Sequence, residues 1–305
     1  MLRTHPLTLA IALAIAVALP AIHAQAPAGR TLARIADTGR IRFGYRTDAR
    51  PFSYAEQSGN PGGYSVALCQ QVANAVKTQL RKSNLAVEWV AVTAQDRYKA
   101  LQQGTIDLLC GADSMTLERR TSVAFSTPIF PGGTGAMLRS DAPLRLREVL
   151  SGKGQTFRPT WRAQAGDVLR SRGFAAVSGT TSEKWLQQRI KDLQVVTVVA
   201  PVPTYEAGVD AVLGRRADAL FGERAILLDS ARRNGTRDLI VLDRLFSYEP
   251  LALAMALNDD EFRLLVDRTL SHFYASGELG GLYTIWFGEP DESAFTFFRW
   301  NTIQE

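Results

Sequence analysis

Segments with the patterns of strands and of helices alternate along most of the chain. In the first part, apolar strand patterns at 41–45, 86–92 and 106–110 are separated by helical patterns at 64–80 and 96–103. Repeated strand–helix–strand units are typical of a parallel sheet that is covered by helices. This alternation therefore predicts an α/β fold with a largely parallel sheet.

A second alternating unit follows the first. Its predicted strands and helices are, in chain order, 174–177, 183–192, 195–199, 205–213, 217–222, 224–233, 239–242 and 251–256. Helices are predicted over 261–275 and 281–286 near the end of the chain. The segment 140–172 is rich in arginine and contains Pro159, and we interpret it as an irregular surface excursion of the second unit.

Polar residues stand directly after several predicted strands. Arg46, the segment 93–97 and the segment 111–119 each follow one of them. Ligands of parallel α/β sheets bind at the carboxyl ends of the strands. The sequence therefore predicts a ligand site that these three segments help to form.

The run Ser178-Gly179-Thr180-Thr181-Ser182-Glu183 follows a predicted strand and opens a predicted helix. Hydroxyl side chains cap helices, and the free N–H groups of a helix N-terminus favour an anion. Together with separate arginines, this run indicates a small ligand that carries carboxylates.

The N-terminus has the pattern of a secretory signal peptide. Arg3 precedes an apolar stretch at 7–19, and small residues follow around Ala24 and Ala26. We expect residues 1–26 to be cleaved near Ala24 or Ala26, which leaves an exported chain of about 280 residues. An uncleaved membrane anchor is the alternative, but the apolar stretch is short for a span.

Composition excludes several classes of function. The formal net charge is +5, and the basic residues are scattered rather than grouped as in nucleic-acid binding proteins. The chain has three histidines, so we expect no metal site, and nothing in the sequence calls for a cofactor. Cys69 and Cys110 either pair or remain two buried thiols, and we favour the thiols because the sequence does not give their distance.

Short motifs along the chain match one known family in their order and spacing. The chain resembles the periplasmic polar amino-acid binding proteins of ABC uptake systems, solute-binding protein family 3, and is most similar to the glutamate/aspartate-binding group. The similarity covers residues 31–288. The motifs that carry it are TLARIA at 31–36, PFSY at 51–54, GYS at 63–65, LQQGTID at 101–107, CG at 110–111, LER at 117–119, AFS at 124–126, SGTTSE at 178–183, SGE at 276–278 and IWF at 285–287.

The resemblance implies a type II periplasmic binding protein with two α/β lobes and two hinge strands. The first lobe would contain residues 27–136 plus 250–305, and the second would contain residues 137–249. The cleft between the lobes would close on an amino acid, because the ligand adds contacts that exist only in the closed form. The family also implies a monomer that delivers its ligand to an inner-membrane ABC permease.

Five residues match ligand-contacting positions of the family. Arg119 matches the arginine that clamps the ligand α-carboxylate, a role that suits a planar, charged guanidinium. Thr180 and Thr181 match residues of the second lobe that close on the same carboxylate, and capping of the next helix is compatible with that role. Arg46 and Arg97 match the arginines that contact the side-chain carboxylate in the glutamate/aspartate group.

Three further residues belong to the expected site. Glu223 matches the acceptor of the ligand α-ammonium, which is usually an aspartate in the family. Tyr205 stands near a histidine that contacts the ligand in relatives. Phe52 is interpreted as an aromatic wall of the cleft, although a core position is also compatible with its place after a turn.

The segment Ala112-Asp113-Ser114 departs from the family at two positions. Relatives have small hydroxyl residues at 112 and 113, in a loop that supplies hydrogen-bond acceptors to the ligand. Asp113 either binds the ligand ammonium or neutralises an arginine. If it pairs with Arg97, the preference would shift toward an amide such as glutamine or asparagine.

Two other functions remain compatible with the sequence. Some exported dehydratases of prephenate or arogenate are similar to this fold, and Asp113 and Glu223 would then form an acid/base pair. A ligand sensor that signals to a membrane partner is the other possibility, with the segment 140–172 as a partner surface. The arginine set favours the non-catalytic binding protein.

Overall fold

We analysed a computed structural model of the whole chain. It describes residues 31–152, 166–170, 172–234 and 237–304. The predicted signal peptide and its cleavage site lie outside the described residues, as does the middle of the segment 140–172. In the described ranges, no helix combines the length and the apolar character that a membrane span requires.

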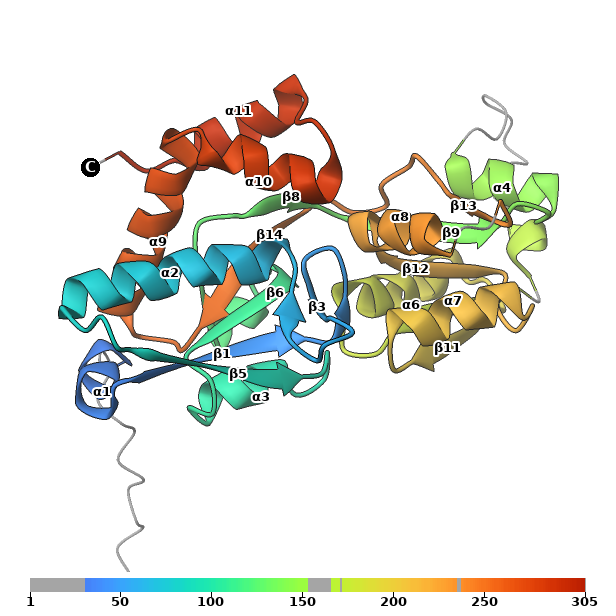
Figure 1. Cartoon of the computed structure of the whole chain (residues 1–305). Helices are drawn as coiled ribbons and strands as arrows, with labels where there is room; N and C mark the ends of the chain where they lie inside the picture. Colours follow the sequence, from blue (N-terminus) through green and yellow to red (C-terminus); the bar gives the residue numbers. More distant parts are fainter. Residues whose placement is uncertain (1–30, 153–165, 171, 235–236, 305) are drawn as a thin grey trace, which may run out of the picture.

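The strands form two large sheets and one small one (Figure 1). The first sheet has the order β5, β1, β6, β14, β7, and β8 also pairs with β14. These strands are β1 (Arg40–Arg46), β5 (Ala86–Val92), β6 (Leu108–Ser114), β7 (Ala124–Phe125), β8 (Phe130–Gly132) and β14 (Glu249–Met255). β1 is parallel to β5 and β6, whereas β14 is antiparallel to β6.

The second sheet has the order β11, β10, β12, β9, β13. These strands are β9 (Thr134–Arg139), β10 (Gly173–Val177), β11 (Val198–Val202), β12 (Ala219–Glu223) and β13 (Leu239–Val241). β10 is parallel to β11 and β12, and β9 is antiparallel to both β12 and β13. The third sheet is the short meander β2 (Asp48–Ala49), β3 (Ser53–Ala55) and β4 (Pro61–Gly62).

Each large sheet carries its own helices, and we call each sheet with its helices a lobe (Figure 1). The helices of the first lobe are α1 (Thr31–Thr38), α2 (Tyr64–Leu80), α3 (Arg97–Gln102), α9 (Asp260–Ala275), α10 (Glu278–Phe287) and α11 (Glu292–Asn301). Those of the second lobe are α4 (Leu144–Ser151), α6 (Thr181–Leu193), α7 (Tyr205–Leu213) and α8 (Arg224–Arg233). The predicted α/β fold class is confirmed.

Two chain segments connect the lobes side by side. One passes from β8 to β9, and the other returns from β13 to β14, as the green and orange ribbons in Figure 1 show. Glu249 lies opposite Gly132 and Leu251 lies opposite Phe130 where the segments pair. The predicted lobe limits at residues 136 and 250 stay a prediction. Gly132 pairs with the first sheet and Thr134 with the second, so the chain passes from one sheet to the other at Gly133.

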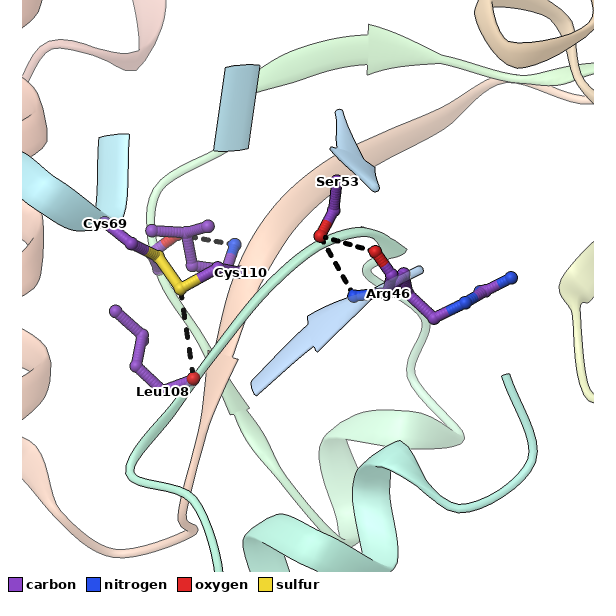
Figure 2. The surroundings of a disulfide bond; sticks show 7 residues. Arg46, Ser53, Cys69, Leu108 and Cys110 are labelled. Carbon is purple, nitrogen blue, oxygen red and sulfur yellow. Dashed lines mark hydrogen bonds between the residues drawn. A yellow bond between two sulfur atoms is a disulfide. The ribbon is translucent and has the colours of Figure 1, made fainter. Parts of the chain in front are cut away.

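Cys69 of α2 and Cys110 of β6 form a disulfide bond with a Cα–Cα distance of 6.1 Å (Figure 2). The interpretation of two buried thiols is therefore wrong. Both residues are fully buried, so burial gave no reason to choose between the two states. The pairing follows from the packing of α2 on the first sheet, which brings together residues 41 positions apart.

Several element boundaries differ from the prediction for identifiable reasons. The strand predicted at 195–199 begins at Val198 and includes Pro201, which an edge strand tolerates because it needs hydrogen bonds on one side only. The strand predicted at 106–110 continues to Ser114, because β14 pairs with its polar end. Strand β9 and helix α11 were not predicted.

The segment 140–172 is more regular than we expected. It contains α4, whose Leu146 and Leu150 are buried in the core of the second lobe. Arginines flank Leu146, so the helical spacing of the apolar residues is hard to recognise in the sequence. In its described part, the interpretation of an irregular excursion is therefore wrong.

Candidate functional site

Polar side chains from both lobes surround a small cavity between the two large sheets. The side chains that line it are Arg46, Ala49, Arg97, Ala112, Ser114, Arg119, Thr134, Thr180, Thr181, Ser182, Tyr205, Glu223, Ile226 and Glu249. The cavity has a volume of about 20 Å³, which is enough for about one water molecule. The lobes therefore have to separate before a larger molecule can enter.

Arg46 is the last residue of β1 and is buried, with 6% of its surface exposed. Ser53 holds its backbone, since the hydroxyl accepts from Arg46 N–H and donates to Arg46 O (Figure 2). The Nε of Arg46 donates to Asp48 Oδ1 at 2.8 Å. Asp48 Oδ2 accepts from Tyr205 N–H at 3.4 Å, so this ion pair contacts the N-terminus of α7 in the second lobe.

Arg97 forms a buried ion pair with Asp113, and both side chains are at most 3% exposed. The Nε of Arg97 lies 2.5 Å from Asp113 Oδ1, which also accepts from the hydroxyl of Tyr98 at 3.0 Å. Burial lowers the pKa of Arg97, but the charge of Asp113 and the contact with Tyr98 raise it above its ordinary value. Of the two roles predicted for Asp113, the structure shows the neutralisation of an arginine.

Arg119 follows β6 and begins a short 3₁₀ helix. Its Nη1 donates to Ser114 O at 2.9 Å, and its guanidinium lies 5.1 Å from the ring centroid of Tyr98. Its Nη2 lies 3.5 Å from Gly179 O in the second lobe. The same carbonyl accepts from both Nη atoms of Arg97 at 3.4–3.5 Å, so both arginines connect the two lobes.

The N-terminus of α6 has two threonine hydroxyl groups at the cavity, and the second of them contacts the first lobe. Thr180 caps the helix, with its side chain accepting from Glu183 N–H at 3.2 Å. Thr181 Oγ1 lies 3.1 Å from Ser114 Oγ and donates to Glu249 Oε2 at 2.6 Å. The predicted hydroxyl run is thus both a helix cap and part of the cavity wall.

Glu223 ends β12 and caps α8. Its carboxylate accepts from Gly133 N–H at 2.8 Å and from Ala225 N–H at 3.3 Å. Burial raises the pKa of Glu223 to about 8, although these two backbone donors act in the opposite direction. Its own N–H donates to the hydroxyl of Tyr205, and burial raises the pKa of that tyrosine as well.

Two residues of the predicted site do not line the cavity. Phe52 is fully buried among aromatic rings, 5.0 Å from Phe130 and 5.4 Å from Phe287 between centroids. Its predicted position in the cleft wall is wrong, because the ring packs into the core of the first lobe. Asp113 stands behind Arg97 instead of facing the cavity. The other predicted residues lie together.

Glu249 lines the cavity, and the sequence analysis did not find it. It is the first residue of β14, where it pairs with Gly132. Ser247 donates to its Oε1 at 2.8 Å, while Thr181 holds its Oε2. A glutamate at the start of an apolar strand has no distinctive local pattern, so only the pairing of the two connecting segments reveals its place.

Charges of both signs stand at the cavity in nearly equal number. Three arginines are present, and the carboxyl groups of Asp48, Asp113, Glu223 and Glu249 lie beside or behind them. Burial favours the neutral form of Glu223, so the other three supply the negative charge. Such a site suits a zwitterion, which brings charges of both signs, because each ligand charge then meets a partner.

The chain is similar to known proteins over most of its length. The family model of bacterial extracellular solute-binding proteins, family 3, matches residues 41–289. The L-glutamate/L-aspartate-binding protein of Pseudomonas aeruginosa PAO1 is 29% identical over 262 residues, which cover 85% of this chain and 80% of that protein. The glutamate/aspartate import solute-binding protein of Escherichia coli K12 is 28% identical over 292 residues, covering 93% and 89%.

Solved structures with the same fold include two amino-acid binding proteins. An ancestral amino acid-binding protein, described as a precursor of cyclohexadienyl dehydratase, has a TM-score of 0.69 and 24% identity, covering 84% of this chain and 99% of that one. A solute receptor for L-cysteine of Neisseria gonorrhoeae has a TM-score of 0.68 and 22% identity, covering 87% and 98%. At these identities the likeness concerns the fold.

Proposed function

Since this chain belongs to the bacterial extracellular solute-binding proteins of family 3, we propose that it captures glutamate or aspartate for uptake by an ABC importer. The ligand would enter the open cleft, and the lobes would close over it. In this role the protein works in the periplasm and passes its ligand, unchanged, to a membrane permease.

The observation that carries the proposal is the meeting of Arg119 with the N-terminus of α6. Arg119 stands on the first lobe and α6 on the second, and both Arg119 and Thr181 line one cavity. A guanidinium and a helix N-terminus each favour a carboxylate. A ligand carboxylate between them would be bound by both lobes and would stabilise the closed form.

Arg97, which lines the same cavity as Arg46, supports the choice of an acidic amino acid. The Nε of Arg97 donates to Asp113, whereas its Nη atoms make only contacts of 3.4–3.5 Å, with Gly179 O and with the hydroxyl of Tyr98. A ligand carboxylate can replace these weak contacts while Asp113 keeps the guanidinium in place. The relatives named for glutamate and aspartate support the same choice.

Calorimetric titration tests the proposal directly. The purified protein, unfolded and refolded to remove bound ligand, is titrated with glutamate, aspartate, glutamine and asparagine. We expect the two acidic amino acids to bind most tightly. If only the amides bind, the neutralisation of Arg97 by Asp113 has changed the specificity, and the acidic assignment is wrong.

Two arginine variants test whether Arg119 binds the ligand carboxylate. Arg119→Ala should weaken binding of glutamate by roughly thirtyfold or more, since truncating one side of a charged hydrogen-bonded pair costs about 2–5 kcal/mol. Arg120→Ala removes the same side chain from the adjacent exposed position and should bind as the wild type does. Equal affinities of these two variants would contradict the role of Arg119.

The dehydratase alternative requires Asp113 and Glu223 to exchange protons with a substrate. Asp113 contacts Arg97 and does not line the cavity, and Glu223 accepts two backbone hydrogen bonds. We therefore expect prephenate and arogenate to be recovered unchanged after incubation with the protein. Formation of phenylpyruvate or phenylalanine would overturn this part of the proposal.

A further inference from the structure

The α-ammonium group of an amino acid needs an acceptor, and two carboxylates that line the cavity can provide it. Glu223 and Glu249 both stand in the wall. Asp48 and Asp113 are each bound to an arginine and do not line the cavity. A Cβ at Gly111 would meet Asp113 Oδ2 at 2.5 Å, so that oxygen is directed against the backbone of β6. The choice is therefore between Glu223 and Glu249.

The carboxyl group of Glu223 is held by backbone N–H groups. One oxygen accepts from Gly133 N–H in the connection between the lobes, and the other accepts from Ala225 N–H at the start of α8. Backbone donors such as these cannot turn to another acceptor without moving the chain. Burial also raises the pKa of Glu223 to about 8, which disfavours the charged form that an ammonium group requires.

Glu249 is held by groups that can rotate. Its two oxygens accept from the hydroxyls of Ser247 and Thr181, at 2.8 and 2.6 Å. A hydroxyl is both donor and acceptor and can turn, and each carboxylate oxygen can accept more than one hydrogen bond. An ammonium group with three donors can thus bind to Glu249 without disturbing the backbone.

The position of Glu249 also matches the shape of an α-amino acid. The ammonium and the carboxylate are attached to the same carbon, so their binding groups have to be neighbours. Glu249 bonds to Thr181, which lies 3.1 Å from the hydroxyl of Ser114, and Ser114 O accepts from Arg119. The carboxylate of Glu249 therefore lies next to Arg119 and Thr181, the residues proposed to bind the ligand carboxylate, in the cavity wall.

We propose that Glu249, and not Glu223, accepts the α-ammonium group of the ligand. This inference rests on the proposed function. Glu249 also begins the strand that returns from the second lobe, so an ammonium group bound there contacts the hinge as well as both lobes. The family position occupied by Glu223 then serves to fix α8 and the connection between the lobes.

The test compares glutamate with glutarate, which keeps both carboxylates and lacks only the ammonium group. Wild-type protein should bind glutamate about ten- to a hundredfold more tightly, as expected for the loss of a charged hydrogen bond. Glu249→Gln should weaken glutamate binding by about tenfold or more and leave glutarate binding unchanged or tighter. Glu249→Asp keeps the charge and should retain part of the preference.

Two further variants complete the experiment. Glu148→Gln makes the same chemical change on the exposed side of α4 and should bind both ligands as the wild type does. Glu223→Gln should keep the preference for glutamate over glutarate, whatever its absolute affinity. Thermal unfolding of each variant checks that it is folded.

The outcomes separate this inference from the function on which it rests. If wild-type protein binds glutamate but Glu249→Gln weakens both ligands equally, the assignment of Glu249 is wrong and the proposed function stands. If Glu223→Gln abolishes the preference instead, Glu223 is the acceptor. If wild-type protein binds neither glutamate nor aspartate, the proposed function itself fails and this inference fails with it.

Discussion

At the scale of single residues, the site is organised by carboxylates that hold arginines. Asp48 pairs with Arg46 and Asp113 pairs with Arg97, and all four side chains are buried. A buried guanidinium without a partner is costly, so the paired aspartate keeps each arginine in place when no ligand is bound. The same pairing lowers the positive charge that a ligand meets.

Asp113 should therefore weaken the preference for acidic amino acids. In Asp113→Asn the hydrogen-bonding shape is kept but Arg97 loses its counter-charge. We expect the ratio of glutamate to glutamine affinity to rise by about tenfold, which corresponds to 1.4 kcal/mol. Stability without ligand should fall by about 3–5 kcal/mol, as for other buried pairs that lose one charge.

Calorimetry and urea unfolding measure these two effects. Asp37→Asn, on the exposed side of α1, is the matched control and should change neither. An unchanged glutamate-to-glutamine ratio in Asp113→Asn would mean that Arg97 does not contact the ligand side chain.

Glu223 should make stability depend on pH. Its pKa is raised from 4.5 to about 8 by burial, so the folded protein keeps this proton over a pH range in which the unfolded chain has lost it. Folding stability therefore falls as pH rises from about 4.5 to 8. One pKa unit corresponds to about 1.4 kcal/mol, so the expected decrease is a few kcal/mol.

The variant Glu223→Gln should have a flatter pH profile. Urea unfolding at pH 5 and pH 8 gives the slope for both proteins. The absolute stability of the variant is not informative, because glutamine replaces one of the two acceptors for Gly133 and Ala225 with a donor. Equal slopes would show that Glu223 is charged in the folded protein at both pH values.

At the scale of elements, helix N-termini and strand ends carry the site. Helix α6 begins at a capped hydroxyl run, and α8 begins at Glu223. Strands β1 and β6 end at Arg46 and Ser114, which face these helices across the cavity. Because helices and strands hold site residues more precisely than loops do, we expect the donors and acceptors at their ends to keep their positions within each lobe when the cleft opens.

The disulfide connects two of these elements, α2 and β6. Replacing Cys69 and Cys110 with alanine should lower the free energy of unfolding by about 3–4 kcal/mol, because the bond closes a loop of 41 residues in the unfolded chain. Glutamate affinity should stay within about threefold of wild type, since neither cysteine lines the cavity.

Urea unfolding with and without a reducing agent measures the effect of the bond. Reductant should destabilise the wild type and leave the double alanine variant unchanged. A wild type whose stability is the same in both conditions would contradict a stabilising bond between α2 and β6.

At the scale of the whole molecule, closure depends on close contact between the lobes. Gly179 in the second lobe has a φ of +79°, and a Cβ at this position would meet Ala94 O of the first lobe at 2.9 Å. Its carbonyl oxygen also accepts from Arg97 and Arg119. A residue with a side chain at 179 would therefore hold the lobes apart.

Gly179→Ala should favour the open form and weaken glutamate binding by roughly five- to a hundredfold, since such overlaps cost about 1–3 kcal/mol. Small-angle X-ray scattering should give a larger radius of gyration for the variant than for the wild type when glutamate is present. Gly104→Ala is the control, because Gly104 has a φ of +65° but no atom within 4 Å of its Cβ position.

The two glycine variants separate local strain from contact between the lobes. Both place alanine in a left-handed conformation, so both lose the stability that this conformation costs. If Gly104→Ala weakens glutamate binding as much as Gly179→Ala does, backbone strain explains the effect and close contact at Gly179 does not matter for closure.

The sequence by itself was sufficient for the fold class, the family and most of the cavity wall. Strand and helix patterns depend on neighbouring residues, so 64–80, 86–92, 205–213 and 224–233 were predicted with the bounds that the structure has. Hydroxyl caps and arginines after strands are local features too, and the structure brings Thr181 and Arg119 together.

Only the tertiary structure decided which partner each charged or reactive side chain has. Arg97 and Asp113 are 16 residues apart, Cys69 and Cys110 are 41 apart, and the contact of Thr181 with Glu249 spans 68. Periodicity in a sequence reports which face of an element is buried, but it contains no distance between elements. Those distances follow from strand register and from the packing of helices on the two sheets, and these set the charge of the site.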